Sequence, residues 1–213
     1  MMRSFVSIDK FIIQADRWLR AASGKTPPAT RESPAHHLKQ PALSTAHRQQ
    51  AQRLMRVNHA GEVAAQALYQ GQAFTGRNAQ LIQQLQHSAD EEYDHLSWCA
   101  ERIKELKGHT SYLNPLWYAG SFTIGALAGA WGDKWSLGFL VETEEQVVAH
   151  LEKHLEKLPT EDIKSRRILL QMKADEAEHA QKAQQAGAAE LPFAIKLGMK
   201  LVSKVMTTTA YFI

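Results

Sequence analysis

Apolar residues recur at helical spacing along four long segments of this 213-residue chain. The segments lie at roughly 45–75, 77–107, 137–158 and 161–187, and a fifth pattern of this kind begins near Pro192. Ala, Leu, Gln, Glu and Lys, which are good helix formers, are abundant, and runs of β-branched residues are few. Long amphipathic segments joined by short connections predict an all-α helical bundle.

The chain before residue 45 has a different character. Residues 4–22 read as a short amphipathic helix, because Ile8, Ile12, Ala15 and Leu19 share one side. Residues 23–41 then hold four of the seven prolines, which is typical of a linker. We therefore expect an N-terminal amphipathic helix and linker over 1–44, followed by a single domain over 45–213.

Composition excludes several classes of protein. A single cysteine, Cys99, rules out an intramolecular disulfide and a cysteine-based zinc site. The net charge of +3 comes entirely from the last 23 residues, which contain Lys196, Lys200 and Lys204 and no acid, so the remainder has 22 basic and 22 acidic residues. That distribution is not the diffuse basic surface of a nucleic-acid-binding protein.

One apolar segment departs from the amphipathic pattern. Gly108 to Gly132 contains no Asp, Glu, Lys or Arg over 25 residues, and Gly125 and Gly129 form a GxxxG pair. Its length alone would allow it to span a bilayer. A buried crossover or an interfacial segment is the alternative, and we expect this one, because a span would separate the acidic residues on its two sides.

Two of the predicted helices carry the motif Glu-x-x-His, as Glu92/His95 and Glu176/His179. Residues three apart on a helix point the same way, so each pair addresses one point in space. Each pair interrupts an otherwise apolar face. The residues of these two faces are Leu81, Leu85, Ser88, Cys99, Ile103 and Leu106, and Leu169, Met172 and Ala183. The neighbouring acids that we expect to point into solvent are Asp90, Asp94, Asp175 and Glu178.

Single glutamates repeat this anomaly on the other two helices. Glu144 stands alone among hydrophobic residues, whereas Glu142 and Glu145 fall off that face. Glu62 shares a less regular face with Tyr69. Each half of the chain therefore supplies one helix with a lone Glu and then one with Glu-x-x-His, which is the inward-facing ligand set of ferritin-like di-metal bundles.

The charge balance favours metal. Four ionised carboxylates on apolar faces would each cost several kcal/mol if unpaired, whereas two divalent cations neutralise them. Oxygen-rich ligation with two imidazoles suits iron or manganese rather than structural zinc. The predicted metal ligands are Glu62, Glu92, His95, Glu144, Glu176 and His179. We predict no catalytic residue beyond these ligands; the alternative is that the acids are protonated or partly exposed at the edge of the core.

Other polar residues receive simpler interpretations. His150 and His154 lie off the face of Glu144, so we expect them at the surface or behind the ligands. His59 could orient Glu62 or lie on the helix surface, and Cys99 reads as a core thiol.

Three runs of sequence resemble the demethoxyubiquinone hydroxylase family of ubiquinone biosynthesis. They are Asn58-His59-Ala60-Gly61-Glu62, Asp90-Glu91-Glu92-Tyr93-Asp94-His95-Leu96 and Asp175-Glu176-Ala177-Glu178-His179. Glu144, within Glu142 to Gln146, matches that family's second isolated ligand. The resemblance covers roughly residue 45 to the end, and the first 45 residues are similar to bacterial members with an N-terminal extension.

This resemblance implies a ferritin-like bundle with flanking helices and a specific reaction. The ring of 2-polyprenyl-3-methyl-6-methoxy-1,4-benzoquinol would be hydroxylated with dioxygen, two iron ions and an external electron donor. Glu92 and Glu176 would bridge the irons, Glu62 with His95 and Glu144 with His179 would complete them, and which His serves which iron stays open. Other ubiquinone-biosynthesis proteins are possible partners.

A polyprenylated substrate also implies a membrane. Lys196, Lys200 and Lys204 form one basic stripe on the C-terminal helix, and the apolar strip expected beside it consists of Ile195, Met199, Val202 and Met206. We therefore expect a peripheral protein on the cytoplasmic side of a bacterial inner membrane. The alternative is that this helix caps the bundle and leaves a solvated Lys edge.

Two other functions use the same sequence features. A ferroxidase or peroxide-scavenging ferritin relative would have the same metal ligands, but the apolar crossover and the Lys stripe have no obvious purpose there. A metal-free helical scaffold on a membrane surface would bind no stoichiometric iron.

Overall fold

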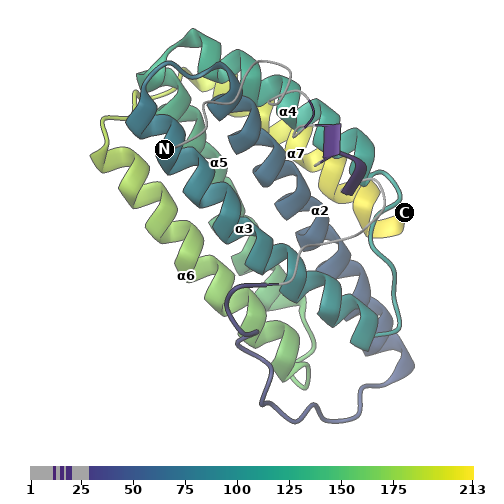
Figure 1. Ribbon diagram of the computed structural model, residues 1–213. Helices are drawn as coiled ribbons and strands as arrows, with labels where there is room; N and C mark the ends of the chain where they lie inside the picture. Colours follow the sequence, from purple (N-terminus) through teal and green to yellow (C-terminus); the bar gives the residue numbers. More distant parts are fainter. Residues whose placement is uncertain (1–11, 13–14, 17, 21–28) are drawn as a thin grey trace.

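The predicted all-α fold is confirmed by a computed structural model, which describes residues 12, 15–16, 18–20 and 29–213 (Figure 1). From residue 45 onward six helices follow one another, and the described residues contain no strand. Their bounds are α2 Thr45–Thr75, α3 Ala79–Glu105, α4 Asn114–Trp131, α5 Asp133–Lys157, α6 Ile163–Gln185 and α7 Phe193–Phe212. The bounds of α2, α3, α5 and α6 lie within a few residues of the four periodic segments predicted from the sequence.

Several helices begin at a side chain that caps their first backbone N–H groups. Ser44 accepts a hydrogen bond from the backbone N–H of His47 before α2, and Asp162 accepts one from that of Ser165 before α6. Asn78 caps α3 in the same way, because its side chain accepts hydrogen bonds from the backbone N–H groups of Gln80 and Leu81. Between α4 and α5 stands Gly132 with φ of +120°, a conformation that favours glycine, so α5 starts directly after it.

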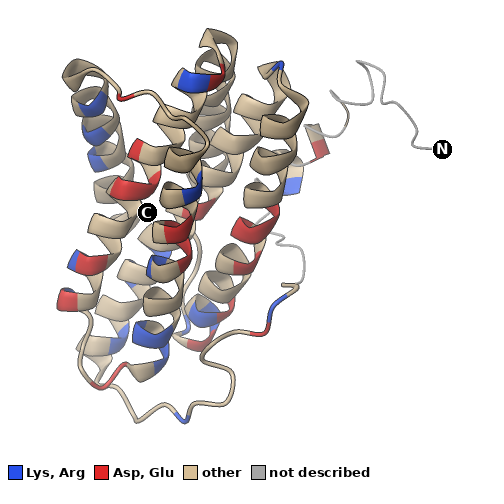
Figure 2. Ribbon diagram, turned by 90° about the vertical axis from the view of Figure 1, so that its left-hand side faces the viewer, with Lys and Arg blue, Asp and Glu red and all other residues tan. Residues whose placement is uncertain are grey.

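Helices α2, α3, α5 and α6 form the four-helix core. α2 packs on α3 and α5 packs on α6, and the two pairs meet through contacts of α2 with α5 and of α3 with α6 (Figure 1). The largest buried cluster gathers side chains from all four helices, including Met55, Ile103, Leu151 and Leu169. In Figure 2, acidic positions on neighbouring helices lie at the middle height of this bundle.

The apolar crossover is a helix, α4, that lies along α2. The approach is close because a Cβ added at Gly125 would lie 2.1 Å from the carbonyl oxygen of Leu68, and one added at Gly71 would lie 2.2 Å from that of Phe122. The GxxxG pair therefore serves packing within the chain. Among the described residues, no helix is both long enough and apolar enough to cross a bilayer.

The segment that precedes α2 is attached to the bundle by side chains of α3. Trp98 Nε1 donates to the carbonyl oxygen of Arg31 at 3.1 Å, and Arg102 Nη2 donates to Gln40 Oε1 at 3.1 Å. Of the predicted N-terminal helix, the described residues 12, 15–16 and 18–20 are helical, and the rest lie outside the described part of the chain. The division into 1–44 and 45–213 stays a prediction.

Candidate metal centre

The structure brings all six predicted ligands together in the core. Glu62 comes from α2, Glu92 and His95 from α3, Glu144 from α5, and Glu176 and His179 from α6. Each is at most 5% exposed. Their donor atoms form two overlapping groups within which all atoms lie within 4.8 Å of one another: Glu62, Glu92, His95 and Glu176, and Glu92, Glu144, Glu176 and His179. Glu92 and Glu176 belong to both groups, as residues that bridge two ions would.

Both imidazoles turn the same nitrogen toward the carboxylates. His95 Nδ1 lies 3.0 Å from Glu176 Oε1, 3.1 Å from Glu92 Oε2 and 3.8 Å from Glu62 Oε2. His179 Nδ1 lies 3.3 Å from Glu176 Oε2 and 3.9 Å from Glu144 Oε1. Glu62 is therefore grouped with His95 and Glu144 with His179, and Nδ1 is the nitrogen placed to bind an ion in each case.

Both carboxylate oxygens of Glu144 are buried and have no hydrogen-bond partner among the described residues. Burial, reinforced by the charge of neighbouring glutamates, raises the pKa of Glu62 and of Glu144 well above the usual range. Although burial opposes protonation, hydrogen bonds to Glu176 and Glu92 raise the pKa of His179 to about 12. Unpaired buried oxygens that converge with imidazole nitrogens fit a pair of divalent cations.

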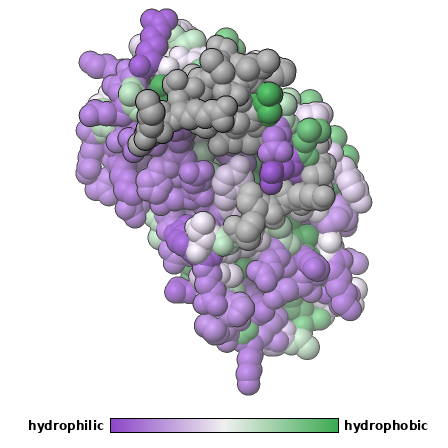
Figure 3. All heavy atoms as spheres, viewed as in Figure 1, coloured by the Kyte–Doolittle hydropathy of each residue, from purple (hydrophilic) through white to green (hydrophobic). Residues whose placement is uncertain are grey.

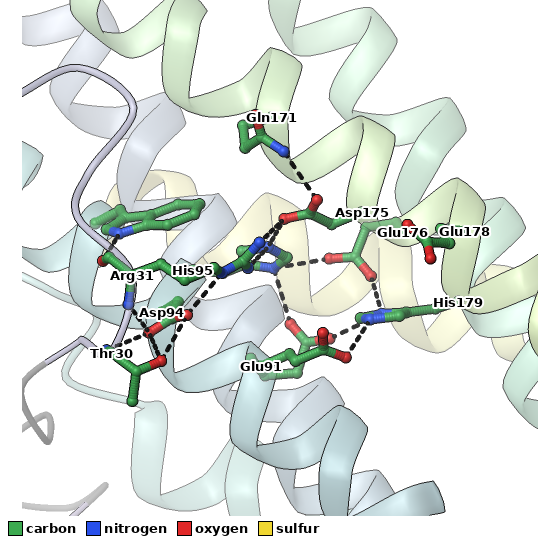
Figure 4. Close-up of polar contacts among 12 residues, drawn as sticks. Thr30, Arg31, Glu91, Asp94, His95, Gln171, Asp175, Glu176, Glu178 and His179 are labelled. Carbon is green, nitrogen blue, oxygen red and sulfur yellow. Dashed lines mark hydrogen bonds and ion pairs between the residues drawn. The ribbon is translucent and has the colours of Figure 1, made fainter.

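Each outward-facing imidazole nitrogen meets a carboxylate of the opposite helix (Figure 4). His95 Nε2 lies 2.9 Å from Asp175 Oδ2, and His179 Nε2 lies 3.0 Å from Glu91 Oε2. Such carboxylates fix the orientation of histidine ligands in metal sites. Both acids directly precede the Glu of a Glu-x-x-His motif, which is the sequence signal that could have revealed them.

The expectation that Asp94 and Asp175 point into solvent is wrong. Asp94 is 1% exposed and accepts hydrogen bonds from the backbone N–H groups of Thr30 and Arg31, at 2.6 Å and 3.3 Å. Asp175 is half-buried and pairs with Arg31 Nη1 at 3.0 Å. The error arose because the partner cation lies in a segment without helical periodicity. Asp90 and Glu178 are exposed, as expected.

Beside the carboxylates lies an apolar cavity of about 620 Å³ between α2, α4, α5 and α7. Glu62 lines it directly. Its apolar lining includes Leu68, Ile124, Phe139, Val147 and Met199. The polar side chains that line it include Asn58, Thr143, Gln146 and His150.

His59 and His154 are buried, and His150, which lines the cavity, is partly buried. His154 is 5% exposed and its Nδ1 lies 2.8 Å from Asn58 Oδ1, and the rings of His150 and His154 have centroids 3.9 Å apart. Burial lowers the pKa of His150 to about 4 and, with the charges of His150 and Lys157, that of His154 to about 2. His59 is also buried, next to Asn114.

Fold and site together define a ferritin-like helical bundle with a buried glutamate–histidine cluster whose donor atoms fit metal binding. Among solved structures, the chain is similar to a thioferritin, the bacterioferritin-related protein from Bacteroides fragilis, with a TM-score of 0.54 and 20% identity over 67% of this chain and 85% of that one. At this identity the likeness concerns the fold alone.

Sequence comparison identifies the family. The family model described as "Ubiquinone biosynthesis protein COQ7" matches residues 49–210, so the chain belongs to this family. A protein of Nitrosococcus oceani named 3-demethoxyubiquinol 3-hydroxylase is 54% identical over 211 residues, which cover 99% of each chain. One of the same name from Coxiella burnetii is 51% identical over 211 residues, 99% of this chain and 98% of that one. The resemblance read from the three sequence runs is thereby confirmed.

Proposed function

We propose that this chain is a 3-demethoxyubiquinol 3-hydroxylase that uses two iron ions and dioxygen to hydroxylate the ring of 2-polyprenyl-3-methyl-6-methoxy-1,4-benzoquinol. The observation that carries the proposal is the contact between two features: a buried set of four carboxylates and two imidazoles, and an apolar cavity that opens onto one of those carboxylates, Glu62. Family membership and the names of the relatives support the same reaction.

The six ligands would hold the irons in two overlapping sets. Glu62 and His95 would complete one ion and Glu144 and His179 the other, with Glu92 and Glu176 shared. When bound, iron supplies the activation of dioxygen, which the side chains of the protein cannot supply. Because the ligand oxygens are fixed by four packed helices, the geometry is set before substrate arrives. An external donor supplies the electrons.

The cavity would place the quinol ring beside Glu62 and exclude water. Its apolar walls from α2, α4, α5 and α7 suit an aromatic ring and the start of a polyprenyl chain. Polar contacts to the ring oxygens are available from Thr143, Gln146 and His150, and the Nε2 atom of His150 has no other hydrogen-bond partner among the described residues. These groups would orient the ring rather than take part in the chemistry.

The outer surfaces of α4 and α7 would rest on a membrane. Large apolar side chains are exposed on both helices, namely Leu116, Leu127 and Trp131 on α4 and Phe193, Leu197, Leu201, Val202, Val205 and Phe212 on α7. Figure 3 shows hydrophobic residues along the right-hand edge, the side on which α4 and α7 lie in Figure 1. A polyprenyl quinol resides in the bilayer, so a peripheral position at the inner membrane, on the cytoplasmic side, gives the cavity access to it.

The structure changes one detail of this membrane proposal. Ile195, Met199, Val202 and Met206 all line the cavity, and of these four only Val202, at 57%, is also an exposed large hydrophobic residue. The strip that would insert therefore consists of Val202 together with Leu197, Leu201 and Val205, which are 44%, 57% and 62% exposed.

The test is product formation with labelled oxygen. Iron-loaded protein is supplied with a chemical reductant, a short-tailed demethoxyubiquinol and ¹⁸O₂, and mass spectrometry measures label in the ring. We expect one labelled oxygen atom per product. Met199→Trp, which fills the cavity, should abolish product without loss of iron, and Lys200→Trp on the exposed side of the same helix should not. Ferric mineral without hydroxylated product would instead indicate a ferroxidase, and protein that binds no iron would indicate a scaffold.

A further inference from the structure

The two outward-facing imidazole nitrogens have equivalent partners in unequal surroundings. Asp175 accepts from His95 Nε2 and Glu91 accepts from His179 Nε2, at 2.9 Å and 3.0 Å. Asp175 is shorter and its side chain is 15% exposed, whereas that of Glu91 is 32% exposed. The two halves of the site therefore differ in how firmly each imidazole is held.

Asp175 is fixed from two further directions. Gln171 Nε2 donates to its Oδ1 at 2.9 Å, and Arg31 Nη1 lies 3.0 Å from its Oδ2 (Figure 4). Arg31 Nη2 also lies 3.5 Å from His95 Nε2. The guanidinium of Arg31 and the Nε2–H of His95 are both donors, so Asp175 Oδ2 is the acceptor that they share.

Arg31, whose side chain is 41% exposed, has three further contacts of its own. Its Nε atom pairs with Asp94 Oδ2 at 2.8 Å, its guanidinium carbon lies 4.9 Å from the ring centroid of Trp98, and its carbonyl oxygen accepts from Trp98 Nε1. One guanidinium thus joins two carboxylates of different helices, Asp94 on α3 and Asp175 on α6. Around Glu91, the only further ion pair within 4 Å among the described residues is with His87, at 3.8 Å, and the His87 side chain is 75% exposed.

We propose that Arg31 is a positioning residue that makes the two metal positions unequal. By fixing Asp175 against His95, it slows the release of the ion held with Glu62 and His95 relative to that of the ion held with Glu144 and His179. The inference rests on the proposed two-ion centre and adds an order of release to it. The ion held with Glu62 and His95 leaves slowly, and the ion held with Glu144 and His179 leaves faster.

The physical reason is orientation. A carboxylate that is fixed through both oxygens holds the imidazole with Nε2–H outward and Nδ1 toward the ion. If the bond between Nδ1 and the ion breaks transiently, the imidazole keeps its orientation and the bond can form again. Loss of such outer partners typically weakens metal binding by about 10- to 100-fold. Asp175 keeps a net negative charge toward His95, because the single positive charge of Arg31 is shared between Asp175 and Asp94.

Metal release from the full-length protein tests this inference. Metal-free protein is loaded with two equivalents of Co²⁺, excess EDTA is added, and the visible absorption of bound Co²⁺ is followed with time. Two phases alone prove nothing, since two ions that share carboxylates repel each other and leave in sequence. The discriminating result is which phase each variant changes.

Three variants and one control give the comparison. Arg31→Ala should accelerate the slow phase about 10- to 100-fold and leave the fast phase unchanged. Arg31→Lys should do nearly the same, because an ammonium group cannot hold Asp94 and Asp175 together. Glu91→Gln should accelerate only the fast phase. Gln40→Ala loosens the same N-terminal segment at its contact with Arg102, away from His95, and should change neither phase.

The possible failures are distinguishable. Wild-type protein that binds no stoichiometric Co²⁺ would overturn the two-ion centre and this inference together. Two bound ions with a slow phase that Arg31→Ala leaves unchanged, or Arg31→Lys kinetics equal to wild type, would overturn the inference alone. If Gln40→Ala accelerated the slow phase as much as Arg31→Ala, the N-terminal segment would act only by shielding the site from solvent, and the specific role of Arg31 would be overturned. Melting temperatures of the metal-free variants verify that each protein is folded.

Discussion

Two adjacent acids on α5 show that a shift of one residue decides whether a side chain lies in the core or in solvent. Glu144 is 1% exposed and both its oxygens lack a hydrogen-bond partner among the described residues, whereas the next residue, Glu145, is exposed. The two side chains have the same chemistry and differ only by the 100° that separates neighbours on a helix. Only Glu144 is therefore able to contribute to the charge balance of the core.

The first prediction follows from this pair. Glu144→Ala removes a carboxylate from the set, so bound iron should fall substantially, and turnover should drop at least about 100-fold, since even outer partners cost 10- to 100-fold. Glu62→Ala and Glu176→Ala should behave alike. Elemental analysis and product formation are measured together. Glu145→Ala and Glu178→Ala are the controls, and if Glu145→Ala lost iron while Glu144→Ala kept it, our assignment on α5 would be wrong.

The second prediction concerns His154 and acid. Its pKa of about 2 in the folded protein lies below the value of about 6.5 expected when unfolded. The unfolded chain therefore binds a proton first, and stability that is complete above pH 6.5 is lost as the pH falls toward 2.

His154→Gln removes this titration and keeps a hydrogen-bonding side chain for Asn58. Between pH 6.5 and 4.5 the variant should lose roughly 2 kcal/mol less unfolding free energy than wild type. Denaturant titration of both metal-free proteins measures the difference, because the buried carboxylates contribute equally to each. Parallel pH profiles would contradict the prediction.

At the scale of helices, α4 depends on its close approach to α2. A methyl group at Gly125 would overlap the carbonyl oxygen of Leu68, and both atoms belong to rigid helices. The contact is what attaches an otherwise apolar helix beside the metal site and closes one wall of the cavity.

The third prediction uses two glycines of α4. Gly125→Ala should destabilise the protein by roughly 1–3 kcal/mol, the usual cost of overpacking. Gly120→Ala should be neutral or stabilising by up to about 1 kcal/mol, because nothing lies within 4 Å of the added Cβ and alanine favours helix. Denaturant unfolding measures both. Equal effects of the two substitutions would show that the α2–α4 contact relaxes easily.

The fourth prediction belongs to α7. A Lys196/Lys200/Lys204→Glu triple mutant should bind anionic vesicles more weakly than wild type, because each lysine contributes roughly 1 kcal/mol near an anionic leaflet. Co-sedimentation with and without anionic lipid measures this. Lys196 also pairs with Glu142 at 3.3 Å, so a Lys200/Lys204→Glu double mutant verifies that the effect does not come from this pair. Wild type that stays in the supernatant would contradict the membrane proposal.

For the molecule as a whole, metal and stability should be linked. The fifth prediction is that removal of iron lowers the melting temperature more at neutral than at acidic pH, since ionised core carboxylates repel one another without cations and are neutralised by acid. An ion at 1,000 times its Kd adds about 4 kcal/mol. Calorimetry of both forms from pH 5 to 8 measures it, and identical curves would argue against a site in the core.

The sequence contained most of this architecture, for reasons that the structure makes clear. Helical spacing predicted the four core helices, and lone acids on apolar faces predicted the six clustered residues, because burial restricts which side chains can occupy a helix face. α4 was recognised only as an apolar segment, since a helix that is apolar all round has no periodic face. Arg31 was missed entirely, because its partners Asp94 and Asp175 are distant in the sequence and its own segment has no repeating pattern.

The division of the ligands along the chain has a consequence for synthesis on the ribosome. Glu62, Glu92 and His95 precede α4, and Glu144, Glu176 and His179 follow it, and each of the two clustered sets draws on both groups. A nascent chain that has emerged only as far as α4 thus lacks at least one donor of every set. Neither donor set for the proposed iron ions is therefore complete until α6, which supplies Glu176 to both, has left the exit tunnel and docked.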